Sequence, residues 1–172
     1  SGLKTLKSKT EFVVPEITFE GFGILILPWL EKREGCREWC ERTFGTLLGK
    51  MHSVSGPAFG YDHVTYCGPT AQRNTWKDEW ADFFWEQRLL PMASLLEGTA
   101  AGTDGLVKSV EEVHKRMARE LSESCTGPRL LHGDLWQGNV LQLGEDSGLI
   151  DPALYFGHPD ADLAMLTLFG HP

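Results

Sequence analysis

The chain has 172 residues, 41% of them hydrophobic, so we expect one domain whose core buries roughly two thirds of the unfolded surface. Its formal net charge of −8 argues against nucleic acid or an anionic membrane as the main partner, because both select basic patches. No apolar run approaches the roughly 20 residues that span a bilayer, and four irregularly spaced cysteines do not suggest a disulfide framework.

The first predicted element is a pair of strands over residues 18–29. Residues 20–23, Glu-Gly-Phe-Gly, supply the turn, and Ile24 to Leu27 form a continuous apolar run. Such a run is typical of a strand in the middle of a sheet. We therefore expect the second strand of the pair to be buried on both faces.

An amphipathic helix is predicted from about Cys36 to Ser53. Its apolar side chains recur every three or four residues: Trp39, Cys40, Phe44, Leu47, Leu48 and Met51. Gly45 and Gly49 lie one turn apart on this helix. Because glycine costs about 1 kcal/mol in a helix interior, the pair predicts close approach by a neighbouring element. His52 is interpreted as a charge that caps the C-terminus of the helix.

The middle of the chain is predicted to hold a long loop and two helices. Gly and Pro punctuate residues 55–75, which indicates a loop and a candidate functional surface. Residues 76–90 predict a helix whose many aromatic rings are interpreted as core. After the small-residue linker 98–102, Asp104 is expected to cap a second helix, with His114 solvated on its polar side. Its apolar residues form one stripe: Leu106, Val110, Val113, Met117 and Leu121.

The most informative stretch is residues 132–139, His-Gly-Asp-Leu-Trp-Gln-Gly-Asn. Apolar runs at 130–131 and 140–143 predict short strands on either side of this loop. Residues 144–148 predict a hairpin turn, which would bring Asp151 back beside the loop. Oxygen-bearing side chains from two segments would then converge on one point.

These residue types fit phosphoryl transfer from ATP. The reaction needs a carboxylate that orients the attacking hydroxyl and accepts its proton, and oxygen ligands that hold Mg²⁺ on the phosphates. Asp134 and Asn139 keep the spacing of the base and one metal ligand in protein kinases, with His132 two residues before the Asp, and Asp151 supplies a later carboxylate. The pattern indicates a phosphotransferase active site. A surface turn that merely uses Asp and Asn as turn formers is the alternative.

Several segments accompany this loop: Gly56-Pro57-Ala58-Phe59-Gly60-Tyr61-Asp62, Asn74-Thr75-Trp76-Lys77-Asp78-Glu79-Trp80, Ile150-Asp151-Pro152-Ala153-Leu154-Tyr155-Phe156-Gly157-His158 and Asp160-Ala161-Asp162-Leu163-Ala164-Met165. Together they resemble the fructosamine (ketosamine) kinases, a branch of the aminoglycoside-phosphotransferase-like kinases. The resemblance implies an α+β, protein-kinase-like fold, mostly the helical C-terminal lobe with a catalytic-loop hairpin. Residues 1–30 would be a remnant of the N-terminal lobe and hinge. Residues 31–172 would be the C-terminal lobe, with the catalytic loop at 132–139 and a metal-binding segment at 149–157.

The resemblance also implies roles for individual residues. Asp134 is expected to be the catalytic base, and Asn139 and Asp151 the Mg²⁺ ligands. His132 and Asp162 are expected to brace the catalytic loop. Because Asp162 precedes an apolar run, it is also a candidate helix N-cap.

Substrate and nucleotide contacts follow from the same resemblance. Trp136 is expected to contact the substrate, since an indole beside the base offers a flat face to a sugar-derived or amine-bearing ligand. Plain packing within the loop is the alternative role. Pro28, Trp29 and Leu30 occupy the place of the kinase hinge, whose backbone groups would meet the adenine of ATP. Pro28 removes one possible donor there.

The implied activity is phosphorylation of the 3-hydroxyl of ketosamines by ATP with Mg²⁺. The acceptor would be a fructosamine or ribulosamine adduct on a small amine or on protein, and phosphorylation would make it labile, as in deglycation repair. The expected partners are therefore ATP and the ketosamine. We expect a cytoplasmic protein in a reducing compartment; an organelle stays open because the chain does not begin with Met. The oligomeric state is not indicated.

The sequence departs from the family pattern at both ends. The early residues contain neither a glycine-rich phosphate loop nor a strand Lys. Residues 1–6 resemble instead the end of the helix that carries the partner of that Lys, and the family continues past Phe169-Gly170. Two alternatives therefore stay open: an aminoglycoside- or choline-type kinase, and a catalytically incomplete fragment or pseudokinase-like binding module. We expect this chain alone to be weakly active or inactive, because positioning of the phosphates is most of the catalysis.

Overall fold

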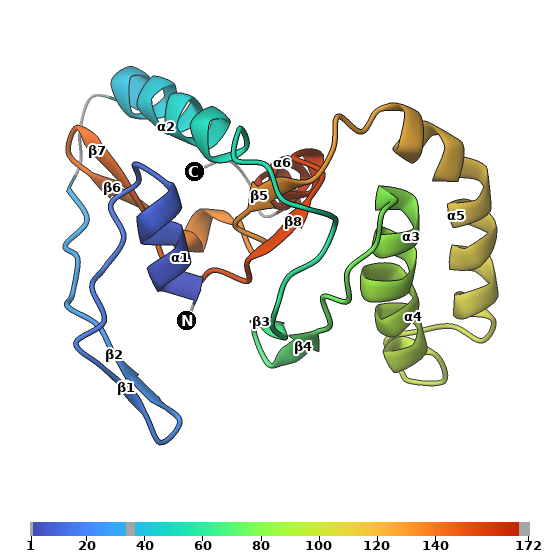
Figure 1. The fold of residues 1–172 in the computed structure, drawn as a ribbon. Coiled ribbons are helices and arrows are strands. Elements are labelled where there is room, and N and C mark those ends of the chain that lie inside the picture. The colour runs from blue at the N-terminus through green and yellow to red at the C-terminus, as the bar shows by residue number, and fades with distance from the viewer. Residues whose placement is uncertain (1, 34–36, 169–172) are drawn as a thin grey trace. The chain divides into compact units, whose positions relative to one another are not determined.

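The computed structural model describes residues 2–33 and 37–168 of the chain (Figure 1). The chain forms two compact units. The first comprises residues 1–54, 129–154 and 159–172, and the second residues 55–128 and 155–158. Cys36, the predicted start of a helix, and Phe169-Gly170 lie outside the described residues. None of the helices in the described ranges has the length and apolar character needed to cross a membrane.

In the described part of the chain, short strands and three α-helices make up the first unit. Its elements are α1 (Gly2–Lys9), β1 (Phe19–Gly21), β2 (Ile24–Ile26), α2 (Arg37–Met51), β5 (Arg129–Leu131), the 3-10 turn η2 (Gln137–Asn139), β6 (Val140–Leu143), β7 (Asp146–Leu149) and α6 (Asp160–Leu168). The second unit is mainly helical. Its elements are β3 (Thr65–Cys67), β4 (Thr70–Gln72), α3 (Trp80–Phe84), the π-helical η1 (Trp85–Leu89), α4 (Leu90–Leu96), α5 (Leu106–Glu123) and β8 (Tyr155–Gly157).

The β6–β7 hairpin is the framework beneath the catalytic loop. Its strands pair antiparallel from Val140–Leu149 to Leu143–Asp146. The predicted hairpin is therefore present, but its turn is shorter than expected. The reason is that Val13 pairs with the outer edge of β7 through two backbone hydrogen bonds of 3.0 Å, which keeps the residues after the turn extended.

A buried apolar core holds this unit together. It is formed by Leu3, Leu6, Leu48, Met51, Leu130, Leu131, Leu135, Leu141 and Leu149. Burying one such side chain stabilises the fold by about 1.5–3 kcal/mol. Two of these residues are fully buried. Leu131 directly precedes the catalytic loop, and Leu135 lies within it. The core therefore anchors the loop directly.

The β1–β2 hairpin forms as predicted, but the expectation that its second strand is buried on both faces is wrong. Phe22 and Gly23 make a two-residue turn with φ of 51° and 74°, as hairpin twist favours. All three residues of β2 are exposed. Within the described ranges these two strands pair only with each other, so no third strand extends the hairpin.

Helix α2 covers most of the predicted span, but within residues 2–33 and 37–168 no neighbouring element approaches its two glycines as expected. A methyl group on Gly45 or Gly49 would meet no atom within 4 Å among the described residues. The predicted close approach of a neighbouring element is therefore wrong. Both glycines lie on the exposed side of the helix.

The second unit departs from the predicted boundaries in two places. The predicted loop 55–75 contains the β3–β4 hairpin. The aromatic helix begins at Trp80 rather than Trp76, because Lys77 exchanges two backbone hydrogen bonds of 2.8 and 2.9 Å with Phe59 and is held extended. Trp80 then stacks on Phe83 and Phe84 in the core, as expected for this helix.

Helix α5 is rotated relative to its predicted stripe. The helix begins at Leu106 after Gly105, so Asp104 is not its N-cap. Met117, a predicted stripe residue, is exposed. His114 was predicted to be solvated, which is wrong: its ring stacks on Trp85 with centroids 5.0 Å apart, and its Nδ1 is buried. Leu106, Val110 and Leu121, the first, second and last stripe residues, are half-buried as the stripe predicted.

Candidate active site

The catalytic loop runs from the end of β5 to the start of β6, and backbone contacts fold it tightly. Gly133 has φ of 81°, a left-handed conformation that glycine adopts at no steric cost. The N–H of Trp136 donates to the carbonyl of Asp134 at 3.1 Å, and the carbonyl of Trp136 accepts from the N–H of Asn139 at 2.9 Å. These bonds turn the loop back on itself between its two polar ends.

The loop brings Asp134 and Asn139 into contact. The side-chain Nδ2 of Asn139 donates to the backbone carbonyl of Asp134 at 2.9 Å and lies 3.4 Å from its carboxylate Oδ2. Asp134 is half-buried and Asn139 is buried. Since Nδ2 is used within the loop, the amide Oδ1 is the atom of Asn139 that can serve as a metal ligand.

Asp151 is held beside the loop by the residues that flank it. The N–H of Ile150 donates to the carbonyl of Asn139 at 3.1 Å, and the N–H of Ala153 donates to the carbonyl of His132 at 2.9 Å. Asp151 itself is exposed and has φ of 51°, a conformation that is uncommon outside glycine. Such backbone outliers cluster at functional sites.

The side chains of Asp151 and Asn139 carry oxygen donors of the kind that magnesium takes. In the described ranges, no three His, Cys, Asp or Glu side chains gather into a metal-binding cluster. Mg²⁺ prefers oxygen ligands and is commonly held by one or two carboxylates together with substrate phosphates. One carboxylate on Asp151 and one amide oxygen on the adjacent Asn139 fit that preference.

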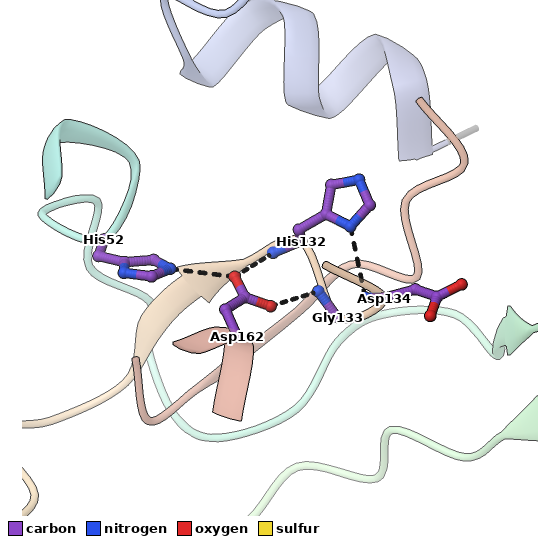
Figure 2. Close-up of polar contacts among 5 residues, drawn as sticks. All are labelled: His52, His132, Gly133, Asp134 and Asp162. Carbon is purple, nitrogen blue, oxygen red and sulfur yellow. Dashed lines mark hydrogen bonds and ion pairs between the residues drawn. The ribbon is translucent and has the colours of Figure 1, made fainter. Parts of the chain in front are cut away.

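Asp162 lies behind the loop, with a side chain that is 1% exposed. Its Oδ2 accepts the backbone N–H of His132 at 2.8 Å, and its Oδ1 accepts that of Gly133 at 2.9 Å (Figure 2). Helix α6 begins at Asp160, and the carboxylate of Asp162 is directed to the loop, so the N-cap interpretation of Asp162 is wrong. A buried carboxylate that accepts several N–H groups is well satisfied.

His52 completes this cluster, and the sequence did not point to it. Its Nε2 lies 3.0 Å from Oδ2 of Asp162, and the two side chains face each other in Figure 2. The predicted role was a charge at the C-terminus of α2. The backbone N–H of His52 does continue the helix by donating to Leu48, but the side chain reaches a residue 110 positions away. No local sequence signal indicates such a pairing.

His132 is buried and neutral. Its Nε2 lies 2.9 Å from the carbonyl of Ile150, and because a carbonyl only accepts, Nε2 carries the proton. Nδ1 then accepts the N–H of Asp134 at 3.4 Å. Burial lowers the pKa of His132, and the nearby Asp162 carboxylate only partly opposes this effect. The imidazole thus links the catalytic loop to the segment that carries Asp151.

The remaining predicted site residues differ in their surroundings. The side chain of Trp136 is 37% exposed on the loop between Asp134 and Asn139. Pro28, Trp29 and Leu30 follow β2, and Trp29 is 90% exposed. Within the described residues, none of these three makes a hydrogen bond to the catalytic loop.

Comparison with known proteins first defines the fold. The structure of a gentamicin–APH(2″)-IIa complex matches with a TM-score of 0.59 at 17% sequence identity, over 93% of this chain and 55% of that chain. The likeness shows that the architecture is kinase-like. The predicted fold class, an α+β kinase-like fold, is confirmed.

Closer matches define the family. The crystal structure of a Thermobifida fusca protein described as a fructosamine-3-kinase matches with a TM-score of 0.88 at 37% identity, over 99% of this chain and 59% of that chain. A probable ketoamine kinase of Enterococcus faecium is 33% identical over 173 residues, which is 96% of this chain and 60% of the relative. The fructosamine kinase family model matches residues 1–171. The chain belongs to the fructosamine kinase family, as its motifs predicted, and it spans about 60% of the length of these relatives.

Proposed function

We propose that the protein phosphorylates the 3-hydroxyl of ketosamines, with ATP as the phosphoryl donor, and thereby serves deglycation. The proposal is supported first by family membership. The observation that carries it is the pair of backbone hydrogen bonds that join the flanks of Asp151 to the two ends of the catalytic loop. They bring the backbone around Asp151 beside the loop that holds the contacting pair Asp134 and Asn139.

Asp134 is the catalytic base of this proposal. Its carboxylate orients the acceptor hydroxyl and takes its proton while the acceptor oxygen bonds to the γ-phosphorus and the bond to ADP breaks. The contact from Asn139 Nδ2 restrains the carboxylate, and Asp162 with His132 holds the backbone on which it stands. These residues position the base before the substrate arrives.

Asn139 and Asp151 would hold Mg²⁺. When bound, the ion neutralises negative charge on the phosphates of the nucleotide. Asp151 has a left-handed backbone that an Asp residue rarely adopts, so its neighbours hold it in this conformation. This supports a role for its side chain as a metal ligand.

Trp136 provides a surface for the acceptor, and Pro28, Trp29 and Leu30 meet the adenine through their backbone. The indole is 37% exposed and directly follows the fully buried Leu135, so it combines a fixed attachment with exposed ring surface. Such a face stacks on the apolar side of a sugar or on an amine cation.

A substrate panel tests the proposal. The full-length protein is assayed with ATP and Mg²⁺ against fructosamines and ribulosamines, aminoglycosides and choline, and phosphate transfer is followed by ADP release and product mass. We expect turnover with the ketosamines. Comparison of the ribulosamine and fructosamine adducts then shows which acceptor the protein prefers. Turnover only with aminoglycosides or choline would show that the proposed acceptor class is wrong and that the protein is a kinase of the aminoglycoside or choline type. ATP binding without any turnover would favour the binding-module alternative.

A further inference from the structure

Gly138 is a glycine that the backbone does not require. It is the middle residue of η2, between Trp136 and Asn139, and its φ lies outside the left-handed region. Any L residue can therefore adopt its conformation. Gly133 in the same loop differs, because its φ of 81° alone explains the glycine. The presence of glycine at 138 needs another reason.

That reason is the indole of Trp136. A Cβ on Gly138 would lie 2.2, 2.4 and 2.6 Å from Cη2, Cζ2 and Cζ3 of Trp136. Real Cβ atoms essentially never come within 3.0 Å of another heavy atom, so any side chain at 138 must displace the ring. The six-membered ring of Trp136 therefore rests against the backbone of Gly138.

The position of the Trp136 ring is fixed relative to the proposed base Asp134 and the proposed metal ligand Asn139. The backbone of Trp136 is hydrogen-bonded on one side to Asp134 and on the other to Asn139. The contact with Gly138 restricts the side-chain torsions of Trp136. The ring keeps more than a third of its surface exposed, so it can meet a ligand beside the base.

We propose that Gly138 is a positioning residue, which fixes the indole of Trp136 beside Asp134 and so sets the affinity for the acceptor rather than for ATP. This inference rests on the proposed function, because it assumes that the indole contacts the acceptor. The acceptors that benefit are those that present a flat apolar face or a cationic amine to the ring. A residue with a Cβ at 138 moves the ring and weakens this contact.

Steady-state kinetics of the full-length protein test the proposal. We expect Gly138→Ala to raise the KM for the ketosamine by roughly 3- to 10-fold, the worth of one aromatic contact, and to leave the KM for ATP within about twofold. Gly49→Ala is the matched control, because its Cβ on exposed helix α2 meets no described atom within 4 Å. It should leave both constants unchanged.

A double-mutant cycle separates the ring from the backbone. In a Trp136→Ala background the clash is absent, so adding Gly138→Ala should leave the acceptor KM at the value of Trp136→Ala alone. An equal rise of KM in both backgrounds overturns the inference, as does a wild-type acceptor KM in Gly138→Ala. Should Gly138→Ala fail to fold, the double variant decides: recovery of folding supports the steric coupling, and continued failure to fold overturns it.

The two proposals fail in different ways. If the wild-type protein phosphorylates ketosamines and the cycle is additive, only the role of Gly138 is lost. If the wild-type protein phosphorylates no ketosamine, the proposed function fails, and this inference falls with it.

Discussion

Nε2 of His52 and Oδ2 of Asp162 form a largely buried hydrogen-bond contact of 3.0 Å between residues at the ends of two helices. His52 follows α2, and Asp162 lies in the first turn of α6. The same carboxylate oxygen accepts the N–H of His132. One carboxylate thus ties two helices and the catalytic loop together, and removal of any donor leaves it less well satisfied.

Replacement of His52 tests the worth of this contact. His52→Ala leaves the buried Asp162 carboxylate without one donor, which should lower the free energy of unfolding by about 1–3 kcal/mol. His52→Gln retains an N–H donor and should recover part of the loss. Urea unfolding of the three proteins measures both effects. Equal stability of His52→Ala and the wild type would mean that Asp162 is satisfied without the imidazole.

The pH dependence of stability should report on His132. Its folded pKa lies below the ordinary value of 6.5 because of burial. As pH falls through 6.5, the unfolded chain gains a proton that the folded protein does not, so the free energy of unfolding decreases. The destabilisation caused by His132 is therefore absent above pH 6.5 and grows as the pH falls below it. In His132→Gln the decrease should be shallower. Unfolding curves at several pH values from neutral to mildly acid measure the slopes, and identical slopes would contradict the buried neutral imidazole.

Asp134→Asn should remove the base while preserving the fold. The amide has the same shape as the carboxylate but cannot accept the hydroxyl proton, so we expect kcat to fall by about 10²- to 10⁴-fold. The free energy of unfolding should change little. Activity assays on the full-length protein, with unfolding as the control, provide the comparison. Activity close to that of the wild type would require another base.

Two substitutions at Asp151 separate its charge from its backbone. Asn tolerates the left-handed conformation, so Asp151→Asn should keep the stability while requiring a higher Mg²⁺ concentration for activity. Asp151→Ala should in addition lose about 1 kcal/mol of stability, because Ala disfavours a φ of 51°. Mg²⁺ titrations of activity and urea unfolding measure the two effects. An unchanged Mg²⁺ response in Asp151→Asn would assign the metal to other groups.

The parts of the site that depend on local sequence were predictable. The loop 132–139, its flanking strands and the hairpin before Asp151 all arise from turn residues and short apolar runs that lie next to one another in the chain. The contact between Asp134 and Asn139 follows from their spacing within one loop. Local pattern suffices there because the chain has few ways to connect the two strands.

The parts that depend on distant partners were not predictable. The pairing of His52 with Asp162 spans 110 positions, and nothing near either residue indicates the other. The extended pairing of Lys77 with Phe59 shortened a helix that the aromatic pattern alone would have started earlier. The exposed second strand of the β1–β2 hairpin shows the same limit, because an apolar run does not state which element will cover it.

The two backbone hydrogen bonds around Asp151 both end on carbonyls of the catalytic loop, at His132 and at Asn139. The backbone around Asp151 is therefore tied at two points to the loop that carries Asp134. In the proposed reaction, one doubly bonded junction rather than two independent loops thus sets the spacing between Asp134 and Asp151.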